Sequence, residues 1–248
     1  MYQDARGCKV YFEQAGSGSP VLLLHGWGVS SEAFRPLFMR LAAHRAVRAI
    51  DFPGFGLSEP PPGVWGTEEY AEMVKELLDA WNLPTVDILA HSFGARVALR
   101  LAAAHPKRVG RLALTGAAGI RLRGNVPFTK KCISNLGKFA GFFGPPGAWL
   151  KSKLYATIAS ADYLNAGTMR PILVKTVNED LRPILPDIAH QTLLLWGAND
   201  QDTKPEAGRI MREGLKNSRL VMMEGAGHYP FLDKPDEFWE QLKVFWEI

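Results

Sequence analysis

Cysteines, long apolar runs and a large charge imbalance are scarce or missing in this 248-residue chain. Cys8 and Cys132 are its two cysteines, and their spacing fits neither a metal site nor a redox pair, which favours a reducing compartment. No apolar run approaches the ~18 residues that span a bilayer. The first ten residues carry three charges and lack the apolar core of a secretory signal. The sequence therefore predicts a cytoplasmic protein without a transmembrane segment.

The net charge of +4 is too small to predict a nucleic-acid partner. The chain also contains no internal repeat and no low-complexity segment. Apolar residues make up 47% of it, which is ample for a buried core. A chain of this length fits one domain, or one domain with an insertion.

Strand-like and helix-like segments alternate along most of the sequence. Short apolar or alternating runs predict strands near residues 9–14, 21–24, 46–50, 86–90, 109–114, 191–196 and 219–223. Helical periodicity and capping signals predict helices near residues 32–43, 67–81, 93–104, 205–215 and 235–246. This alternation is typical of an α/β fold.

Ser92 stands between an apolar run that ends at Ala90 and a helix that begins at Phe93. A strand that turns directly into a helix strains the turn residue and projects its side chain away from the sheet. Small neighbours are needed because the two backbones nearly touch, and Ala90 and Gly94 flank the serine at two residues' distance. The helix also directs its free N–H groups toward any anion formed beside Ser92. These features predict a nucleophilic serine.

This small-x-Ser-x-Gly motif resembles the nucleophile elbow of the α/β-hydrolase family, although Ala90 replaces the commoner glycine. Further motifs support the resemblance: His25-Gly26-Trp27-Gly28, Asp51-Phe52-Pro53-Gly54-Phe55-Gly56-Leu57-Ser58, Trp196-Gly197-Ala198-Asn199-Asp200 and Gly225-Ala226-Gly227-His228. The resemblance covers nearly the whole chain and implies one domain over residues 1–248. It further implies a mostly parallel, doubly wound sheet of about eight strands, with a helical lid inserted after the sixth.

Ser92, Asp200 and His228 occur in the Ser…Asp…His order of that family, each just after a predicted strand. In the mechanism that the resemblance implies, His228 removes the serine proton and Asp200 fixes the imidazole tautomer. Asp202 is an alternative acid, because a small shift of the loop would present it instead. The family pattern favours Asp200.

The resemblance also assigns the oxyanion hole to the backbone N–H groups of Trp27 and Phe93. Two donors are needed because the tetrahedral intermediate carries a full negative charge on one oxygen. The Trp27 side chain either covers the pocket mouth or packs in the core. His25 is expected to hold its loop, and Asp51 is expected to be a loop-fixing carboxylate, not the catalytic acid.

Residues 120–187 break the alternation and form the expected lid. They contain ten basic and four acidic residues, a net charge of +6. This charge is either the solvated face of amphipathic helices or a surface for an acidic substrate, an acyl-carrier protein or anionic lipid. The candidate pocket residues are Trp27, Phe128, Phe142, Phe143 and Tyr229. The three phenylalanines, which belong to the lid segment, either line the pocket or anchor the lid.

A serine at the elbow excludes relatives of this fold that need a carboxylate nucleophile there, such as haloalkane dehalogenases and epoxide hydrolases. We therefore expect a serine hydrolase of small to medium carboxylic esters, with no metal or organic cofactor. The alternatives are a C–C bond hydrolase of ring-cleavage products, a cofactor-free perhydrolase, and a receptor that retains the triad. The His-Gly-Trp-Gly and Asp-x-Pro-Gly motifs are also similar to the pimeloyl-carrier-protein methyl ester esterases.

Overall fold

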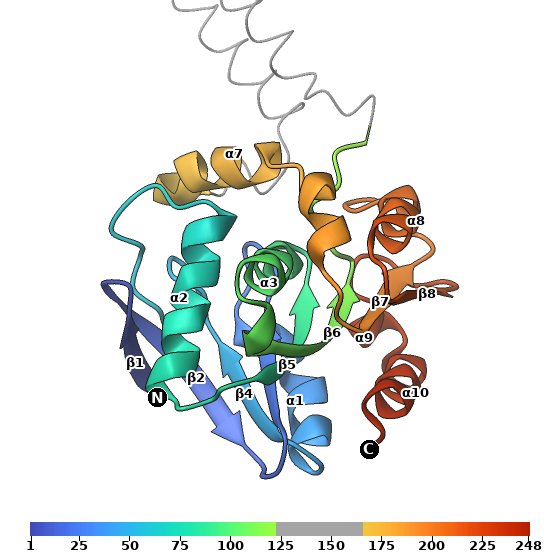
Figure 1. Ribbon diagram of the computed structural model, residues 1–248, viewed down its shortest axis with the longest axis horizontal. Coiled ribbons are helices and arrows are strands. Elements are labelled where there is room, and N and C mark those ends of the chain that lie inside the picture. Colours follow the sequence, from blue (N-terminus) through green and yellow to red (C-terminus); the bar gives the residue numbers. More distant parts are fainter. Residues whose placement is uncertain (123–165) are drawn as a thin grey trace, which may run out of the picture.

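The computed structural model describes residues 1–122 and 166–248, and in these residues one eight-stranded sheet organises the chain (Figure 1). Its strand order is β1-β2-β4-β3-β5-β6-β7-β8. β1 and β2 pair antiparallel to each other, β2 pairs antiparallel to β4, and the remaining pairs are parallel. The expected mostly parallel sheet of about eight strands is confirmed. The strands are β1 (Tyr2–Ala5), β2 (Cys8–Ala15), β3 (Pro20–Leu24), β4 (Ala46–Ile50), β5 (Val86–His91), β6 (Val109–Thr115), β7 (Thr192–Gly197) and β8 (Ser218–Met223).

Helices cover both faces of the sheet. The described α-helices are α1 (Arg35–Ala42), α2 (Thr67–Ala80), α3 (Phe93–Ala104), α7 (Arg170–Asn178), α8 (Pro205–Gly214), α9 (Pro230–Asp233) and α10 (Pro235–Trp246). Buried side chains of α2, α3 and α8 belong to one apolar cluster, and those of α1, α9 and α10 belong to the other. The fold is therefore doubly wound, as the alternation of strands and helices indicates.

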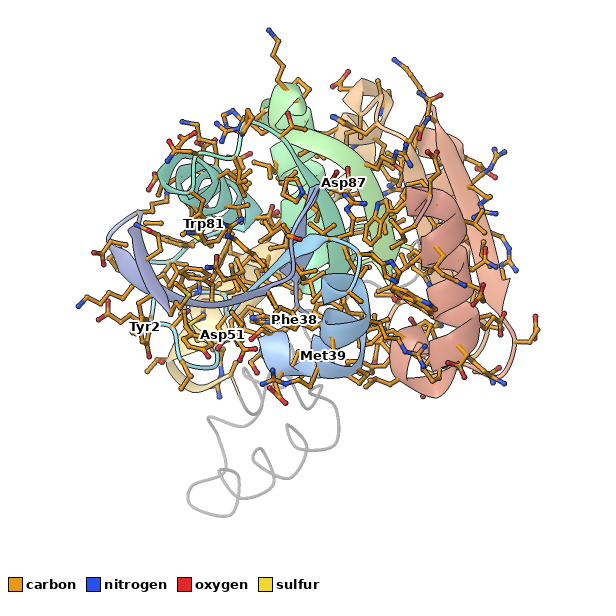
Figure 2. The ribbon with its side chains drawn as sticks, turned by 90° about the horizontal axis from the view of Figure 1, so that it is seen from below. Tyr2, Phe38, Met39, Asp51, Trp81 and Asp87 are labelled. Atoms are coloured by element: carbon orange, nitrogen blue, oxygen red, sulfur yellow. The ribbon has the colours of Figure 1, made fainter. Side chains whose placement is uncertain are left out.

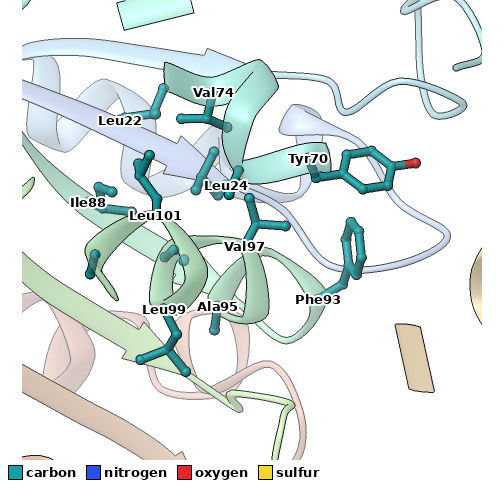
Figure 3. Packing of buried hydrophobic residues seen from close by; sticks show 14 of the residues in the cluster. Leu22, Leu24, Tyr70, Val74, Ile88, Phe93, Ala95, Val97, Leu99 and Leu101 are labelled. Carbon is teal, nitrogen blue, oxygen red and sulfur yellow. The ribbon is translucent and has the colours of Figure 1, made fainter. Parts of the chain in front are cut away.

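The central strands are apolar on both faces because helices bury both faces. Leu22 and Leu24 of β3 point into the cluster under α2 and α3, whereas Leu23 points into the opposite cluster. Figure 3 shows Val97 and Phe93 of α3 in the first cluster, close to β3 and α2. This packing fixes the carboxyl ends of the central strands, where the site described below is found.

Two segments differ from the sequence expectation. The predicted helix at residues 32–43 begins as a 3-10 turn, Ser31–Phe34, and becomes α-helical only from Arg35, with a proline in the first turn of α1. β1 was not predicted, and it forms a hairpin with β2 through Arg6 and Gly7, whose φ angles are 48° and 76°.

Part of the predicted lid lies in the described residues. Of residues 120–187, the structure describes 120–122 and then 166–187, which contain the 3-10 turn Gly167–Met169, α7 and the 3-10 segment Arg182–Asp187. α7 lies against the amino-terminal end of α2, where Lys175 pairs with Glu69 at 3.1 Å (Figure 1). None of the helices in the described part of the chain is both long and apolar enough to cross a membrane.

Candidate active site

Ser92 lies at the sharp turn between β5 and α3, where its backbone is strained. Its φ and ψ angles are 50° and −108°, a conformation that non-glycine residues rarely adopt. The neighbouring backbone leaves no space at Gly94, because a Cβ atom there would lie 2.2 Å from the carbonyl oxygen of Leu24. Ser92 N–H donates to Thr115 O at 3.1 Å, which fixes the turn to β6. The predicted elbow geometry is therefore present at Ser92.

His228 and Asp200 come from the loops after β8 and β7 and contact each other directly. His228 Nδ1 is 2.8 Å from Asp200 Oδ2, and Asp200 is almost fully buried. The same carboxylate accepts hydrogen bonds from Asp202 N–H, Thr203 N–H and Thr203 Oγ1 at 2.8–2.9 Å. Burial alone would raise the pKa of Asp200, but the hydrogen bonds from His228 and Thr203 together hold that pKa below its ordinary value.

Asp202, the alternative acid, is exposed and supports Asp200 through its backbone N–H. Its carboxylate still lies near the pair: within the described ranges, Asp200, Asp202 and His228 each offer a ligand atom within 4.8 Å of the others, a spacing that suits a metal ion. The His228 nitrogen that faces Asp200 is already hydrogen-bonded to it. The arrangement therefore fits a carboxylate, that of Asp200, which orients the His228 ring.

His91, which the sequence reasoning missed, connects the serine loop to the histidine loop. The His91 ring is buried, and its centroid lies 4.6 Å from that of the His228 ring. Its Nε2 lies 2.9 Å from the backbone oxygen of His228. Burial and, to a smaller extent, the nearby His228 lower the pKa of His91 to about 3, so the ring is neutral at pH 7. A carbonyl oxygen only accepts, so we assign the proton to Nε2. A Cβ atom at Gly26 would lie 2.7 Å from His91 Nδ1, so His91 also contacts the His25-Gly26-Trp27 loop.

Trp27 and Phe93, the predicted oxyanion-hole residues, lie side by side. Their rings meet edge to face at 5.5 Å, and both residues line the cavity that contains Ser92. His25 is fully buried, and its Nε2 accepts the Phe52 N–H at 2.9 Å. Burial lowers the pKa of His25 to about 4. His25 thus holds its loop in the neutral form, as expected.

Asp51 fixes two loops through its carboxylate, as expected. It accepts the Ser31 N–H at 2.8 Å and the Leu57 N–H at 2.9 Å. In the view of Figure 2, Asp51 lies inside the outline of the molecule, between Tyr2 and Phe38, and it is buried. A Cβ atom at Gly56 would lie 2.0 Å from this carboxylate, so the glycine of the Asp-x-Pro-Gly-x-Gly loop is required for the close approach.

Ser92 and His228 open into one cavity of about 540 Å³, a size that suits a small organic molecule. Of the five predicted pocket residues, Trp27 and Tyr229 line this cavity. Phe128, Phe142 and Phe143 fall outside the described residues. The other lining residues are His91, Phe93, Arg96, Ala117, Ala118, Gly119, Ile120, Arg121, Leu122, Leu173, Thr176, Val177, Asn178, Asp202, Thr203, Lys204 and Ala207.

Comparison with known proteins agrees with this geometry. The model of the alpha/beta hydrolase family matches residues 21–241, most of the chain. The chain belongs to the alpha/beta hydrolase family. The part of this hydrolase that the match covers includes the strained serine, the buried aspartate and the histidine.

Among curated relatives, the hydrolase is 34% identical over 235 residues to a pimeloyl-[acyl-carrier protein] methyl ester esterase of Neisseria meningitidis, covering 88% of this chain and 73% of the relative. It is 28% identical over 246 residues to a 2-hydroxy-6-oxo-2,4-heptadienoate hydrolase of Pseudomonas putida, covering 91% of this chain and 88% of the relative. Among solved structures, an esterase from Exiguobacterium antarcticum has a TM-score of 0.79 and 28% identity, covering 100% of this chain and 99% of the other.

Proposed function

We propose that this hydrolase cleaves carboxylic esters of small to medium acyl chains through a covalent acyl-enzyme. Ser92 is the nucleophile, His228 the general base and Asp200 the acid that orients the base. The 2.8 Å contact between His228 Nδ1 and Asp200 Oδ2, in the same cavity as the strained Ser92, supports this proposal above all other observations.

In the proposed mechanism, Ser92 Oγ attacks the ester carbonyl carbon while His228 Nε2 takes the hydroxyl proton. Asp200 holds the Nδ1–H tautomer and stabilises the imidazolium without taking its proton. The N–H groups of Trp27 and Phe93 hold the oxyanion. The imidazolium then protonates the departing alcohol. Water attacks the acyl-enzyme with His228 again as base, which releases the acid and restores Ser92. This sequence requires no metal or organic cofactor.

Two of the three relatives reported above are esterases, which supports the ester class, and one of them suggests a specific substrate. The methyl ester esterase at 34% identity makes an ester carried on an acyl-carrier protein the second candidate substrate. We propose that residues 120–187 form a lid over the site, whose excess of basic residues suits an acidic carrier. The scarcity of cysteine favours a cytoplasmic location.

Hydrolysis of chromogenic esters of increasing acyl length, measured for wild type and Ser92→Ala, tests the proposal. Removing the nucleophile of such a triad typically lowers turnover by ~10⁶. Ser17→Ala, at an exposed turn far from the cavity, is the control and should match wild type. Fast cleavage that depends on Ser92, with an optimum acyl length, is the expected result. Cleavage that survives Ser92→Ala would refute the mechanism.

Labelling by a fluorophosphonate, followed by peptide mass spectrometry, identifies the nucleophile independently of substrate. The expected adduct is on Ser92 and is absent from Ser92→Ala. If Ser92 is labelled but simple esters turn over slowly, the carrier-bound methyl ester and a ring-cleavage diketone are the next substrates to compare. Labelling of Ser92 with no turnover of any of them would favour a receptor.

A further inference from the structure

Arg96 is a buried arginine with few partners, one helical turn beyond Ser92. It lies on α3, is 9% exposed and lines the cavity that contains Ser92 and His228. Among the described residues, its one hydrogen bond runs from Nη1 to the backbone oxygen of Glu179, at 3.1 Å. A guanidinium has five N–H donors, so most of those of Arg96 have no protein acceptor within residues 1–122 and 166–248.

The next arginine on the same helix face shows what full pairing looks like. Arg100 pairs with Glu68 at 3.2 Å, lies 3.8 Å from Glu179 Oε2 and donates to Thr67 Oγ1 at 3.2 Å. The Glu179 carboxylate faces the start of α2, where it accepts the N–H and the hydroxyl of Thr67. Glu179 therefore offers Arg96 only its backbone oxygen.

Burying a charged group with few hydrogen-bond partners is costly, so a largely buried guanidinium with a single hydrogen bond to the described residues needs a reason. Burial lowers the pKa of Arg96 to about 10, although the nearby carboxylates of Glu179 and Asp180 act to raise it. Arg96 is still charged at pH 7. It thus presents a positive charge and unused donors to the cavity in which the proposed chemistry occurs.

The charged residues that line the described part of this cavity also favour an anionic ligand. Besides Arg96, the cationic lining residues are Arg121 and Lys204, whereas Asp202 is the one anionic lining residue among those described. A cavity lined mainly by positive charge attracts an anion and disfavours a cation. This distribution is independent of the hydrogen bonding of Arg96.

We propose that Arg96 binds a free carboxylate of the substrate, so that the hydrolase acts on esters whose acyl or alcohol part also carries a carboxylate. The inference rests on the proposed ester hydrolysis. A carboxylate matches the planar, forked donors of a guanidinium and can accept two of them at once. One helical turn separates Ser92 from Arg96, about 6 Å along the axis, so the carboxylate lies a few carbon atoms from the reacting carbonyl.

Matched pairs of esters test this proposal. Monomethyl esters of straight dicarboxylic acids with four to eight carbons are compared with methyl esters of monocarboxylic acids of equal length, by methanol release. A second pair, acetates of hydroxycarboxylic acids and of the matching alcohols, places the carboxylate on the leaving group. Wild type should prefer the charged member of at least one pair by about tenfold or more, because hydrogen bonds to charged groups are strong.

Variants at Arg96 then assign the preference. Arg96→Met should lower kcat/KM for the charged ester about tenfold or more, mainly through KM, and change the neutral ester by less than about threefold. Arg96→Lys keeps the charge but not the fork and should fall between the two. Arg100→Met, whose side chain does not line the cavity, is the matched control and should keep the preference.

Three results separate this inference from the proposed function. Ser92-dependent hydrolysis without a preference for charged esters would overturn the role of Arg96 and leave the esterase intact. Equal losses on both ester classes in Arg96→Met would show that Arg96 only tethers Glu179. If wild type cleaves none of the esters, calorimetry of glutarate with Ser92→Ala and with Ser92→Ala/Arg96→Met decides. Binding lost in the second variant supports the site, and equal or absent binding refutes it.

Discussion

Replacing Asp200 by asparagine tests which of two acids, Asp200 or Asp202, orients His228. Oδ1 of Asp200 accepts two backbone N–H groups, from Asp202 and Thr203. A backbone N–H cannot accept a hydrogen bond, so the side-chain oxygen of the introduced asparagine, and not its NH₂ group, must take the position of Oδ1. The amide NH₂ then occupies the Oδ2 position and points at His228 Nδ1, which lies 2.8 Å from Oδ2 in the native site.

Replacing the carboxylate by an amide changes which ring nitrogen of His228, the proposed base, carries the proton. An amide N–H that donates to Nδ1 moves the imidazole proton to Nε2, where the serine proton should be accepted. A wrong tautomer in a Ser-His-Asp site lowers kcat by ~10⁴, which corresponds to about 5.5 kcal/mol in the barrier. We expect Asp200→Asn to show a loss of this order in kcat, with KM within about threefold of wild type.

Steady-state kinetics on the best ester, for Asp200→Asn beside Asp202→Asn, provides the measurement. Asp202→Asn keeps the backbone N–H that supports Asp200, so its activity should remain within about threefold of wild type. The reasoning is refuted if Asp202→Asn shows the larger loss, because Asp202 would then be the acid that orients His228. Circular dichroism of both variants checks that each is folded.

The same substitution predicts a pH dependence of stability. The pKa of Asp200 is lower in the folded chain than the value of about 3.9 expected for an unfolded aspartate. A lowered folded pKa stabilises the fold above the unfolded value, and this contribution is lost as pH falls through the folded pKa. Urea unfolding should therefore show Asp200→Asn less stable than wild type at pH 7, with a smaller difference near pH 3. A constant difference would contradict this explanation.

Two other substitutions test the elbow and the loop contacts behind it. Gly94→Ala should destabilise the fold by about 1–3 kcal/mol or more in urea unfolding, because the new Cβ would lie 2.2 Å from the Leu24 oxygen. At an ordinary helix position alanine is more stabilising than glycine, so a stabilised variant would refute this prediction. Gly63→Ala has open space and should change stability by less than about 0.5 kcal/mol. His91→Met should lower kcat about tenfold at constant KM, because it loses the hydrogen bond to the backbone oxygen of His228, the proposed general base. His91→Gln should recover part of this loss, and a change confined to KM would contradict that role.

The features that the sequence predicts well are local ones. The strand, Ser92 and the helix after it are consecutive, so the geometry of the turn follows from neighbouring small residues and an apolar run. The same holds for Asp200 and His228, each of which follows a strand within a recognisable short motif. The sequence alone left Asp202 open because the two acids are two residues apart. Their difference lies in burial and hydrogen bonding, which depend on the folded loop.

Long-range contacts could not be predicted. His91 meets the backbone of a residue 137 positions away, and Arg96 meets one 83 positions away. Nothing in their neighbouring residues indicates either partner, and both side chains look like ordinary positions of a strand end and a helix. The hairpin of β1 and β2 was missed for a local reason, because it turns at Arg6-Gly7 and not at a typical Asn-Gly or Asp-Gly pair.

The sheet order has a consequence for when activity can arise during synthesis. Ser92 follows the fifth strand of the chain, whereas His228 follows the eighth, which pairs only with β7 among the described strands. A nascent chain can thus complete the serine turn long before His228 and Asp200 have been made. Under the proposed mechanism a partly synthesised chain would lack the base and the acid, and recovery of activity in refolding should report the docking of the last strand and its loop.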